Sequence, residues 1–131
     1  MSAPFSVATT IFRNPATFAE ISEDLGGQVV DFPDYSYPSM VKAGDSATLV
    51  TGTAFSSSAR TTKIGTVTRS YSVAADTSTS LLVTFTESVF DNNNVKTADA
   101  QTTFRVDTTG NIQFISTGFA VNGQQGSVTF Q

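Results

Sequence analysis

A regular alternation of apolar and hydroxyl side chains constrains the fold of this chain more than any other feature of its sequence. It is clearest in "SLLVTFTESV", residues 80–89. Successive side chains of a β-strand point to opposite faces of the sheet. One face of this segment carries Leu81, Val83, Phe85 and Val89, and the other carries Leu82, Thr84, Thr86 and Ser88. The segment is therefore predicted to be a strand with an apolar face and a hydroxyl face.

Two neighbouring segments show the same alternation. In "TVTRSYSV", residues 66–73, one face carries Val67, Arg69, Tyr71 and Val73, and the other carries Thr66, Thr68, Ser70 and Ser72. In "QTTFRVD", residues 101–107, one face carries Thr102, Phe104 and Val106, and the other carries Gln101, Thr103, Arg105 and Asp107. Three such strands predict an antiparallel sheet that is covered on one side only.

The remaining segments extend this pattern into a meander. Strands are predicted at residues 5–12, 46–55, 111–121 and 126–131, with one short strand after Gly27. Clusters of Ser, Asn, Asp and Gly between them mark turns. A chain of 131 residues is long enough for one core and too short for two. We expect residues 1–131 to form a single, mainly β domain: an antiparallel meander sheet of about six to eight strands.

One helix is predicted near the N-terminus, in "NPATFAEISEDLGG". Asn14 can cap it, and Pro15 suits the first turn, where a missing N–H costs nothing. Phe18, Ile21 and Leu25 share one helical face, so we expect a short core helix over residues 14–25. The segment that follows contains Pro33 and Pro38, which forbid a central strand. It is predicted to be an edge or inter-subunit loop.

Composition limits the kinds of partner. Only 14% of the residues are charged, against about 25% in an average protein, so Thr, Ser, Asn and Gln must supply the polar surface. Such a surface is easier to desolvate than one of Lys and Glu, and it suits contact with neighbouring subunits. The net charge of −4 and the pI of about 4.4 argue against a strong non-specific nucleic-acid binder, which usually has a basic stripe.

The residue types that carry most catalysis are missing. The chain has no His and no Cys, which removes histidine-assisted hydrolysis, cysteine nucleophiles and most zinc or iron sites. The possible carboxylate pairs, Glu87 with Asp99 or Asp107, are interpreted as solvated charges at strand ends. We expect no enzymatic activity, no catalytic residues, no cofactor and no metal site.

Three other features have a structural interpretation. Residues 91–94, "DNNN", lack the glycine and the closing glutamate of a calcium loop and are predicted to form a hairpin turn. Asp31 and Asp34 are interpreted as satisfied turn carboxylates. The tyrosines are expected to pack in the core or an interface rather than to stack on bases; they are Tyr35, Tyr37 and Tyr71.

Targeting signals are not evident. The start, "MSAPFSVATTIFRN", has no basic n-region and no unbroken apolar run, so we expect no signal peptide. No segment approaches the roughly 18 apolar residues of a transmembrane helix. The chain is expected to be made and used without export.

Residues 62–109 resemble the coat proteins of single-stranded RNA bacteriophages. The resemblance lies in "KIGTVTRSYSV", "SLLVTFTESVF", the loop "DNNNVKTADA" and "QTTFRVD". The coat proteins show a similar order of a basic polar strand, a long strand of alternating hydroxyl and apolar residues, a loop near the capsid axes, and another strand. The start "MSAP" and the size also agree. The resemblance covers about a third of the chain and has no signature motif.

The resemblance implies a capsid protein of a virion, made in the host cytoplasm. It implies a homodimer with one continuous sheet, many dimers closing into a shell, and genomic RNA against the inner face of the sheet. The RNA-binding residues implied in this way are Lys63, Thr66, Thr68, Ser70, Thr84, Thr86, Thr103 and Arg105. Hydroxyls and a few cations on a flat sheet can hold phosphates and splayed bases.

Other functions remain open from the sequence. A phage tail-tube or decoration protein would share the β-rich composition and the lack of catalytic residues. A small-ligand-binding open β-barrel is a second alternative, in which the helix over residues 14–25 packs across a curved sheet and closes a cavity. An enzyme of the same barrel type ranks last, because it would depend on a carboxylate within that cavity.

Overall fold

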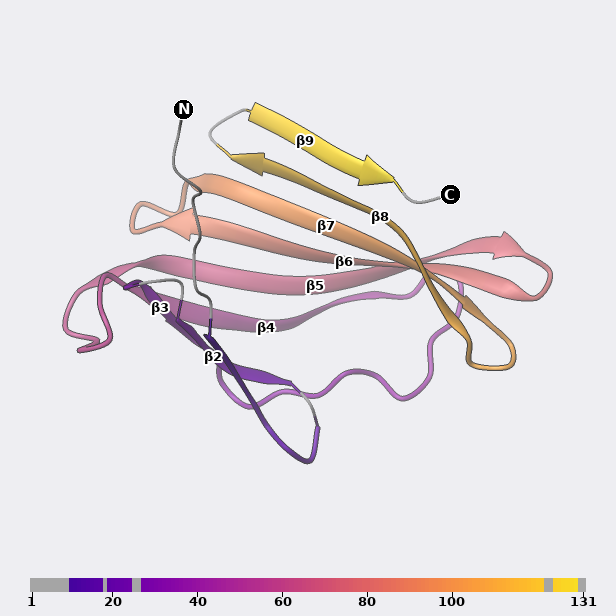
Figure 1. The fold of residues 1–131 in the computed structure, drawn as a ribbon, viewed down its shortest axis with the longest axis horizontal. Coiled ribbons are helices and arrows are strands. Elements are labelled where there is room, and N and C mark those ends of the chain that lie inside the picture. Colours follow the sequence, from indigo (N-terminus) through magenta and orange to yellow (C-terminus); the bar gives the residue numbers. More distant parts are fainter. Residues whose placement is uncertain (1–9, 18, 25–26, 122–123, 130–131) are drawn as a thin grey trace, which may run out of the picture.

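The described part of the chain forms a nine-stranded antiparallel sheet in which every strand pairs with the next one in sequence (Figure 1). The computed structural model describes residues 10–17, 19–24, 27–121 and 124–129. The strands are β1 (Thr10–Arg13), β2 (Glu20–Asp24), β3 (Val29–Asp31), β4 (Ser46–Phe55), β5 (Lys63–Thr77), β6 (Ser80–Asp91), β7 (Lys96–Asp107), β8 (Ile112–Val121) and β9 (Gln124–Thr129). The predicted mainly β meander is confirmed, and β2 lies within the segment where a helix was expected.

Strand register confirms the two predicted faces of the sheet. Cross-strand neighbours share a face, and Ser72, Thr84, Thr103 and Ser116 are paired in turn across β5, β6, β7 and β8. The next row pairs Val73, Val83, Phe104 and Phe114 in the same way. Hydroxyl rows therefore alternate with apolar rows, as the period of two in the sequence requires.

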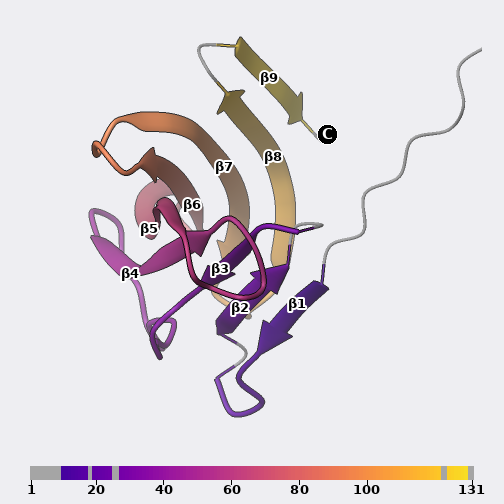
Figure 2. The same ribbon diagram turned by 90° about the vertical axis from the view of Figure 1, so that its left-hand side faces the viewer.

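The sheet is curled, with the apolar rows on its inner side. Figure 2 shows it as an open half-barrel in which β1, β2 and β3 turn under the long central strands. Register shifts in β4, near Thr48, and between β5 and β6, near Ala75, introduce bulges, which increase local twist and bending. We call the inner side the concave face and the outer, hydroxyl-rich side the convex face.

The predicted helix over residues 14–25 is wrong. Asn14 does accept hydrogen bonds from the N–H groups of Ala16 and Thr17, at 2.9 and 3.4 Å, as a helix cap would. Its own N–H, however, donates to the carbonyl of Ala19 at 2.8 Å and closes a turn between β1 and β2. Phe18 and Leu25 lie outside the described residues, and Ile21 is exposed rather than buried.

The physical reason is a set of distant partners that local periodicity cannot reveal. As part of a strand, Glu20 and Glu23 reach Arg69 of β5 with oxygen–nitrogen distances of 2.6 Å each. The helix would have relied on a narrow apolar stripe and would have placed Glu23 in its last turn, where the helix dipole disfavours a negative charge. Long-range ion pairing therefore outweighs a weak local preference.

Among the described residues, a second layer covers one half of the half-barrel. The buried core lies under β2 to β5 and contains Ala19, Val30, Phe32, Tyr35, Val50, Ala54 and Val67. The loop between β3 and β4 contributes Phe32 and Tyr35 and then runs below the sheet (Figure 1), so the irregular segment predicted there is confirmed. Over β6, β7 and β8, Val83 is buried, and the other apolar inner side chains are half-buried or exposed.

Candidate functional site: an ionic cluster and an apolar groove on the concave face

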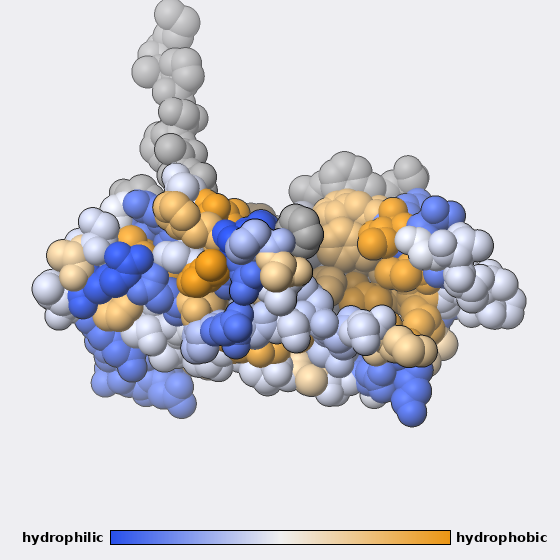
Figure 3. Space-filling view, turned by 90° about the horizontal axis from the view of Figure 1, so that it is seen from below, coloured by the Kyte–Doolittle hydropathy of each residue, from blue (hydrophilic) through white to orange (hydrophobic). Residues whose placement is uncertain are grey.

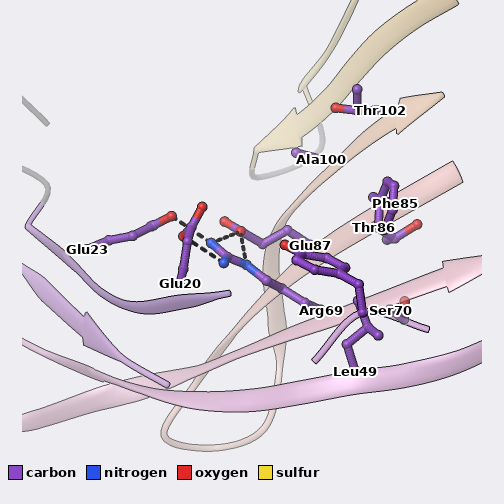
Figure 4. A pocket seen from close by; sticks show the side chains of 11 residues that line it. Glu20, Glu23, Leu49, Arg69, Ser70, Phe85, Thr86, Glu87, Ala100 and Thr102 are labelled. Carbon is purple, nitrogen blue, oxygen red and sulfur yellow. Dashed lines mark hydrogen bonds and ion pairs between the residues drawn. The ribbon is translucent and has the colours of Figure 1, made fainter. Parts of the chain in front are cut away.

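A partly buried ionic cluster lies inside the curl of the sheet, centred on the guanidinium of Arg69 (Figure 4). Glu87 faces Arg69 directly across the β5–β6 ladder, at 2.8 Å between Oε2 and Nη2. The Glu20 and Glu23 carboxylates come from β2, which is three strands away in the sheet. They reach the same guanidinium because the half-barrel is curled. The cluster therefore ties β2 to the central strands across the concave side.

Arg69 has two further contacts with the β3–β4 loop. Its guanidinium carbon lies 4.2 Å from the centroid of the Phe32 ring, a cation–π contact. Its Nη1 also donates to the Tyr35 hydroxyl at 3.3 Å, and the same oxygen accepts the Glu20 N–H at 3.2 Å. Arg69 thus holds two strands and one loop together.

The cluster carries more acid than base, and this shifts its pKa values. Burial raises the pKa of Glu23 to about 7, and a hydrogen bond with Glu20 adds to the effect. Burial opposes the ionisation of Glu20, but the hydrogen bonds from Glu23 and Arg69 outweigh it, so the pKa of Glu20 is lowered. Near neutral pH the two side chains therefore share a proton, with Glu23 as the protonated partner.

This geometry makes the cluster a clamp between strands. The ion pairs in Figure 4 direct one oxygen of each of the three carboxylates at Arg69. In the described part of the chain, no group of three or more acidic side chains is arranged to hold a metal ion. The adjoining hollow of about 290 Å³ is shared with Tyr37 and Phe85.

An apolar groove continues the concave face away from the ionic cluster. It has a volume of about 350 Å³ and is lined by Tyr37, Pro38, Val41, Tyr71, Val83, Phe85, Phe104, Val106 and Ile112. A row of edge-to-face aromatic contacts crosses it, with ring centroids 5.6–6.0 Å apart from Tyr37 through Phe85 and Phe104 to Phe114. Figure 3, seen from below, shows apolar side chains gathered in a hollow on this side of the molecule.

The residues predicted to contact RNA lie together on β5, β6 and β7. The convex face carries Thr66, Thr68, Ser70, Thr84, Thr86, Thr103 and Arg105, and Lys63 is exposed at the start of β5. Several of the hydroxyls bond to one another across strands, as Thr84 does with Thr103 at 2.9 Å. Their grouping on one face agrees with the prediction; RNA contact itself stays a prediction.

The two cations of this set differ in their surroundings. Arg105 donates to Asp76 at 2.7 Å and to Gln113 at 3.3 Å, so an acidic neighbour offsets its charge. Lys63 is exposed. The convex face is therefore mainly a neutral hydroxyl surface with one ion-paired arginine.

The candidate carboxylate pairs of the sequence do not form. Glu87 points to the concave side and binds Arg69, so its interpretation as a solvated charge at a strand end is wrong. Asp99 binds Lys96 at 3.4 Å. Asp107 accepts bonds from Thr109 and Asn111 in its own turn, which lower its pKa to about 2. These three carboxylates serve separate local contacts.

The interpretation of residues 91–94 as a hairpin turn is confirmed. The Asp91 carboxylate accepts the N–H groups of Asn93 and Val95, at 2.8 and 3.0 Å, and closes the β6–β7 hairpin turn. Asp31 and Asp34 have partners, as predicted, but these are distant side chains rather than groups of their own turn. Asp31 ends β3 and binds Arg60, with 2.9 Å between Oδ1 and Nη2, and Asp34 accepts a hydrogen bond from Asn14 at 3.3 Å.

Sequence reasoning missed the ionic cluster, although one signal was present. Arg69 and Glu87 each interrupt the apolar face of their strand, and a charged residue on a buried face needs a partner. Their facing positions follow from the β5–β6 register. The contribution of Glu20 and Glu23 was hidden, because that segment was assigned to a helix.

Comparison with protein-family models, with curated proteins and with solved structures found no match to this chain. In the part of the chain that the structure describes, no helix is long and apolar enough to cross a membrane. The function therefore has to be argued from the surfaces themselves.

Proposed function

We propose that the chain is a structural subunit that assembles with copies of itself into a virion shell, as a coat protein enclosing RNA. The observation that carries this proposal is the open sheet. Among the described residues, the outermost strands β1 and β9 pair on one side only, and an unpaired strand edge is a ready template for another chain. Growth from two edges suits a lattice of subunits.

The composition of the surface supports the same conclusion. The convex face is polar but largely uncharged, and the concave face over β6 to β8 is apolar. Neither face requires many charged groups to be desolvated when it meets another subunit. The clamp around Arg69 meanwhile fixes the curvature of the half-barrel, which any repeated assembly requires.

RNA would meet the convex face in this proposal. Hydroxyl rows can contact phosphates and sugar hydroxyls, and Lys63 supplies an exposed cation. The face offers little net positive charge, so binding would be weak for each subunit and would gain strength from the many copies in a particle.

The test is size-exclusion chromatography of the purified chain with negative-stain microscopy of the leading fraction. We expect regular particles in the megadalton range, and their outline distinguishes a closed shell from a tail tube. Packaged RNA would raise the absorbance at 260 nm far above that of a chain with three Tyr and no Trp. A monomer that persists at high concentration would contradict the proposal.

A ligand-binding open barrel remains the second candidate, and the apolar groove of about 350 Å³ favours it. The closing element would be the β3–β4 loop, since no helix crosses the described part of the sheet. A monomer that takes up a neutral apolar dye, with uptake blocked by Phe104→Arg, would favour this function over assembly.

A further inference from the structure

We infer that the apolar side of β6, β7 and β8 docks against the same surface of a second copy of this chain, so that two half-barrels share one core. This inference rests on the proposed self-assembly and names the surface that the elementary dimer uses. It also differs from the continuous-sheet dimer that the coat-protein resemblance implies, because the contact is face to face. We call this surface the docking face; its side chains are Phe85, Phe104, Val106, Ile112, Phe114, Phe119 and Val121.

The docking face is continuous across three strands. The β7–β8 ladder pairs Val106 with Ile112, Phe104 with Phe114, Ala100 with Phe119 and Ala98 with Val121. Apolar side chains therefore follow β8 along its whole length on the concave side, interrupted by Thr117. The core under β2 to β5 does not extend this far. A sheet with one apolar face needs a second layer to bury it.

The exposed apolar area of the docking face and its rim is close to the area that one partner buries in a stable interface. Ile112 is 70% exposed, Phe119 54% and Val121 47%, and on the rim Tyr37 is 40% and Met40 88% exposed. At about 200 Å² for a fully exposed large apolar residue, these five leave about 600 Å² uncovered. Partly buried neighbours add to this, so the total approaches the roughly 800 Å² that each partner contributes to a stable interface.

The lack of charge on the docking face favours a second copy of the chain as its partner. No charged side chain lines the groove among the described residues, and the adjoining Arg69 cluster is already paired internally. A nucleic acid or a charged peptide would lose hydration here without gaining partners. A second docking face is equally uncharged and apolar.

A two-fold symmetric dimer would also place a protruding side chain of each copy in the groove of the other. In a symmetric dimer the same patch must provide both the protruding group and the recess. Ile112 protrudes at one end of the groove that Phe104 and Val106 help to form. Face-to-face docking leaves the edges of β1 and β9 free, so dimer formation and lattice growth use different surfaces.

The first test compares two neighbouring residues of β8 that are both exposed and point to opposite faces. Ile112→Glu places a charge in the docking face, and Gln113→Glu places the same charge on the convex face. We expect sedimentation equilibrium to show a dimer dissociation constant at least a hundredfold higher for Ile112→Glu, and within threefold of the unmodified chain for Gln113→Glu. Circular dichroism should show the same strand content in all three proteins.

The second test does not depend on weakening the dimer. The chain has no Cys, so single cysteines at adjacent positions of β8 report on one face each. We expect a bifunctional maleimide to link Thr117→Cys, on the concave side, into covalent dimers. Ser116→Cys, which lies on the convex side, should remain largely unlinked at the concentration where dimers but not particles form.

The outcomes separate this inference from the proposed function. If Ile112→Glu keeps both dimer and particles, or if only Ser116→Cys is linked, the docking face is wrong and self-assembly stands. If the unmodified chain is still a monomer at about 100 µM, roughly 100 times a typical micromolar dissociation constant, both the docking face and the proposed self-assembly are wrong. A monomer that binds apolar dye in the groove would likewise overturn the inference and assign the surface to a small ligand.

Discussion

Glu23 is the residue at which the stability of this fold depends most directly on pH. Its pKa is raised from 4.5 to about 7 in the folded chain, so the folded state holds a proton that the unfolded state releases. The stabilisation from this proton is complete below about pH 4.5 and is lost as the pH rises to about 7. Gln mimics the protonated form at every pH.

We therefore expect Glu23→Gln to have the same free energy of unfolding as the unmodified chain at pH 4. At pH 8 the variant should be more stable, by up to about 3 kcal/mol for a shift of this size. Urea unfolding followed by circular dichroism at the two pH values measures the difference. An equal effect at pH 4 and pH 8 would show that Glu23 is not protonated within the cluster.

Substitutions of the two candidate RNA-binding cations, Lys63 and Arg105, should lower RNA packaging to different extents. Asp76 already offsets the charge of Arg105, whereas Lys63 is exposed. If RNA is packaged, we expect Lys63→Ala to lower the RNA content of purified particles more than Arg105→Ala. Asp76→Asn, which leaves Arg105 uncompensated, should raise it. RNA extracted per milligram of protein is the measurement, and an unchanged content in the Lys63→Ala, Arg105→Ala double variant would reject this face as the RNA contact.

At the scale of elements, the Arg69 cluster holds the small strands β1, β2 and β3 under the long ones. Removing the guanidinium would leave the Glu20 and Glu23 carboxyl groups buried without their cation, and breaking such a pair typically costs about 3–5 kcal/mol. We expect Arg69→Leu to lower the free energy of unfolding by this amount. Amide hydrogen exchange should become faster in β2 than in the other strands.

A matched control is Arg60→Leu. Arg60 is also paired with an aspartate, Asp31, but its side chain is 44% exposed, and exposed pairs contribute about 1 kcal/mol or less. Thermal unfolding of the two variants, with hydrogen exchange of β2, tests the difference. If both variants lose an equally small amount of stability, the Arg69 cluster does not hold the N-terminal strands in place.

The elements that could be predicted from sequence are those whose residues alternate in their own strand. The faces of β5, β6 and β7 follow from a period of two, and so does the grouping of the candidate hydroxyls with Arg105 on one of them. The segment of β2 could not be predicted in the same way, because its strand form depends on an ion pair with a residue 46 positions away. The apolar groove was equally hidden, since it arises from the curl and from the course of the β3–β4 loop.

At the scale of the whole molecule, the open edges and the docking face should contribute separately to assembly. Phe12 lies on edge strand β1 and is 56% exposed. A charged side chain on an edge strand discourages pairing with another chain, so we expect Phe12→Lys to form dimers normally but few large particles. Light scattering coupled to size exclusion measures both species. Particles formed at the normal yield would show that β1 is not a lattice contact.

The meander order has a consequence for how the chain reaches its folded state. Because every strand pairs with its neighbour in sequence, a growing chain can add each new strand to one that has just left the ribosome. Contacts of short sequence separation favour fast folding. The Arg69 cluster is different, since β2 must wait for β5 and β6 before its glutamates find their cation. We expect β5, β6 and β7 to order first and the N-terminal strands to close beneath them last.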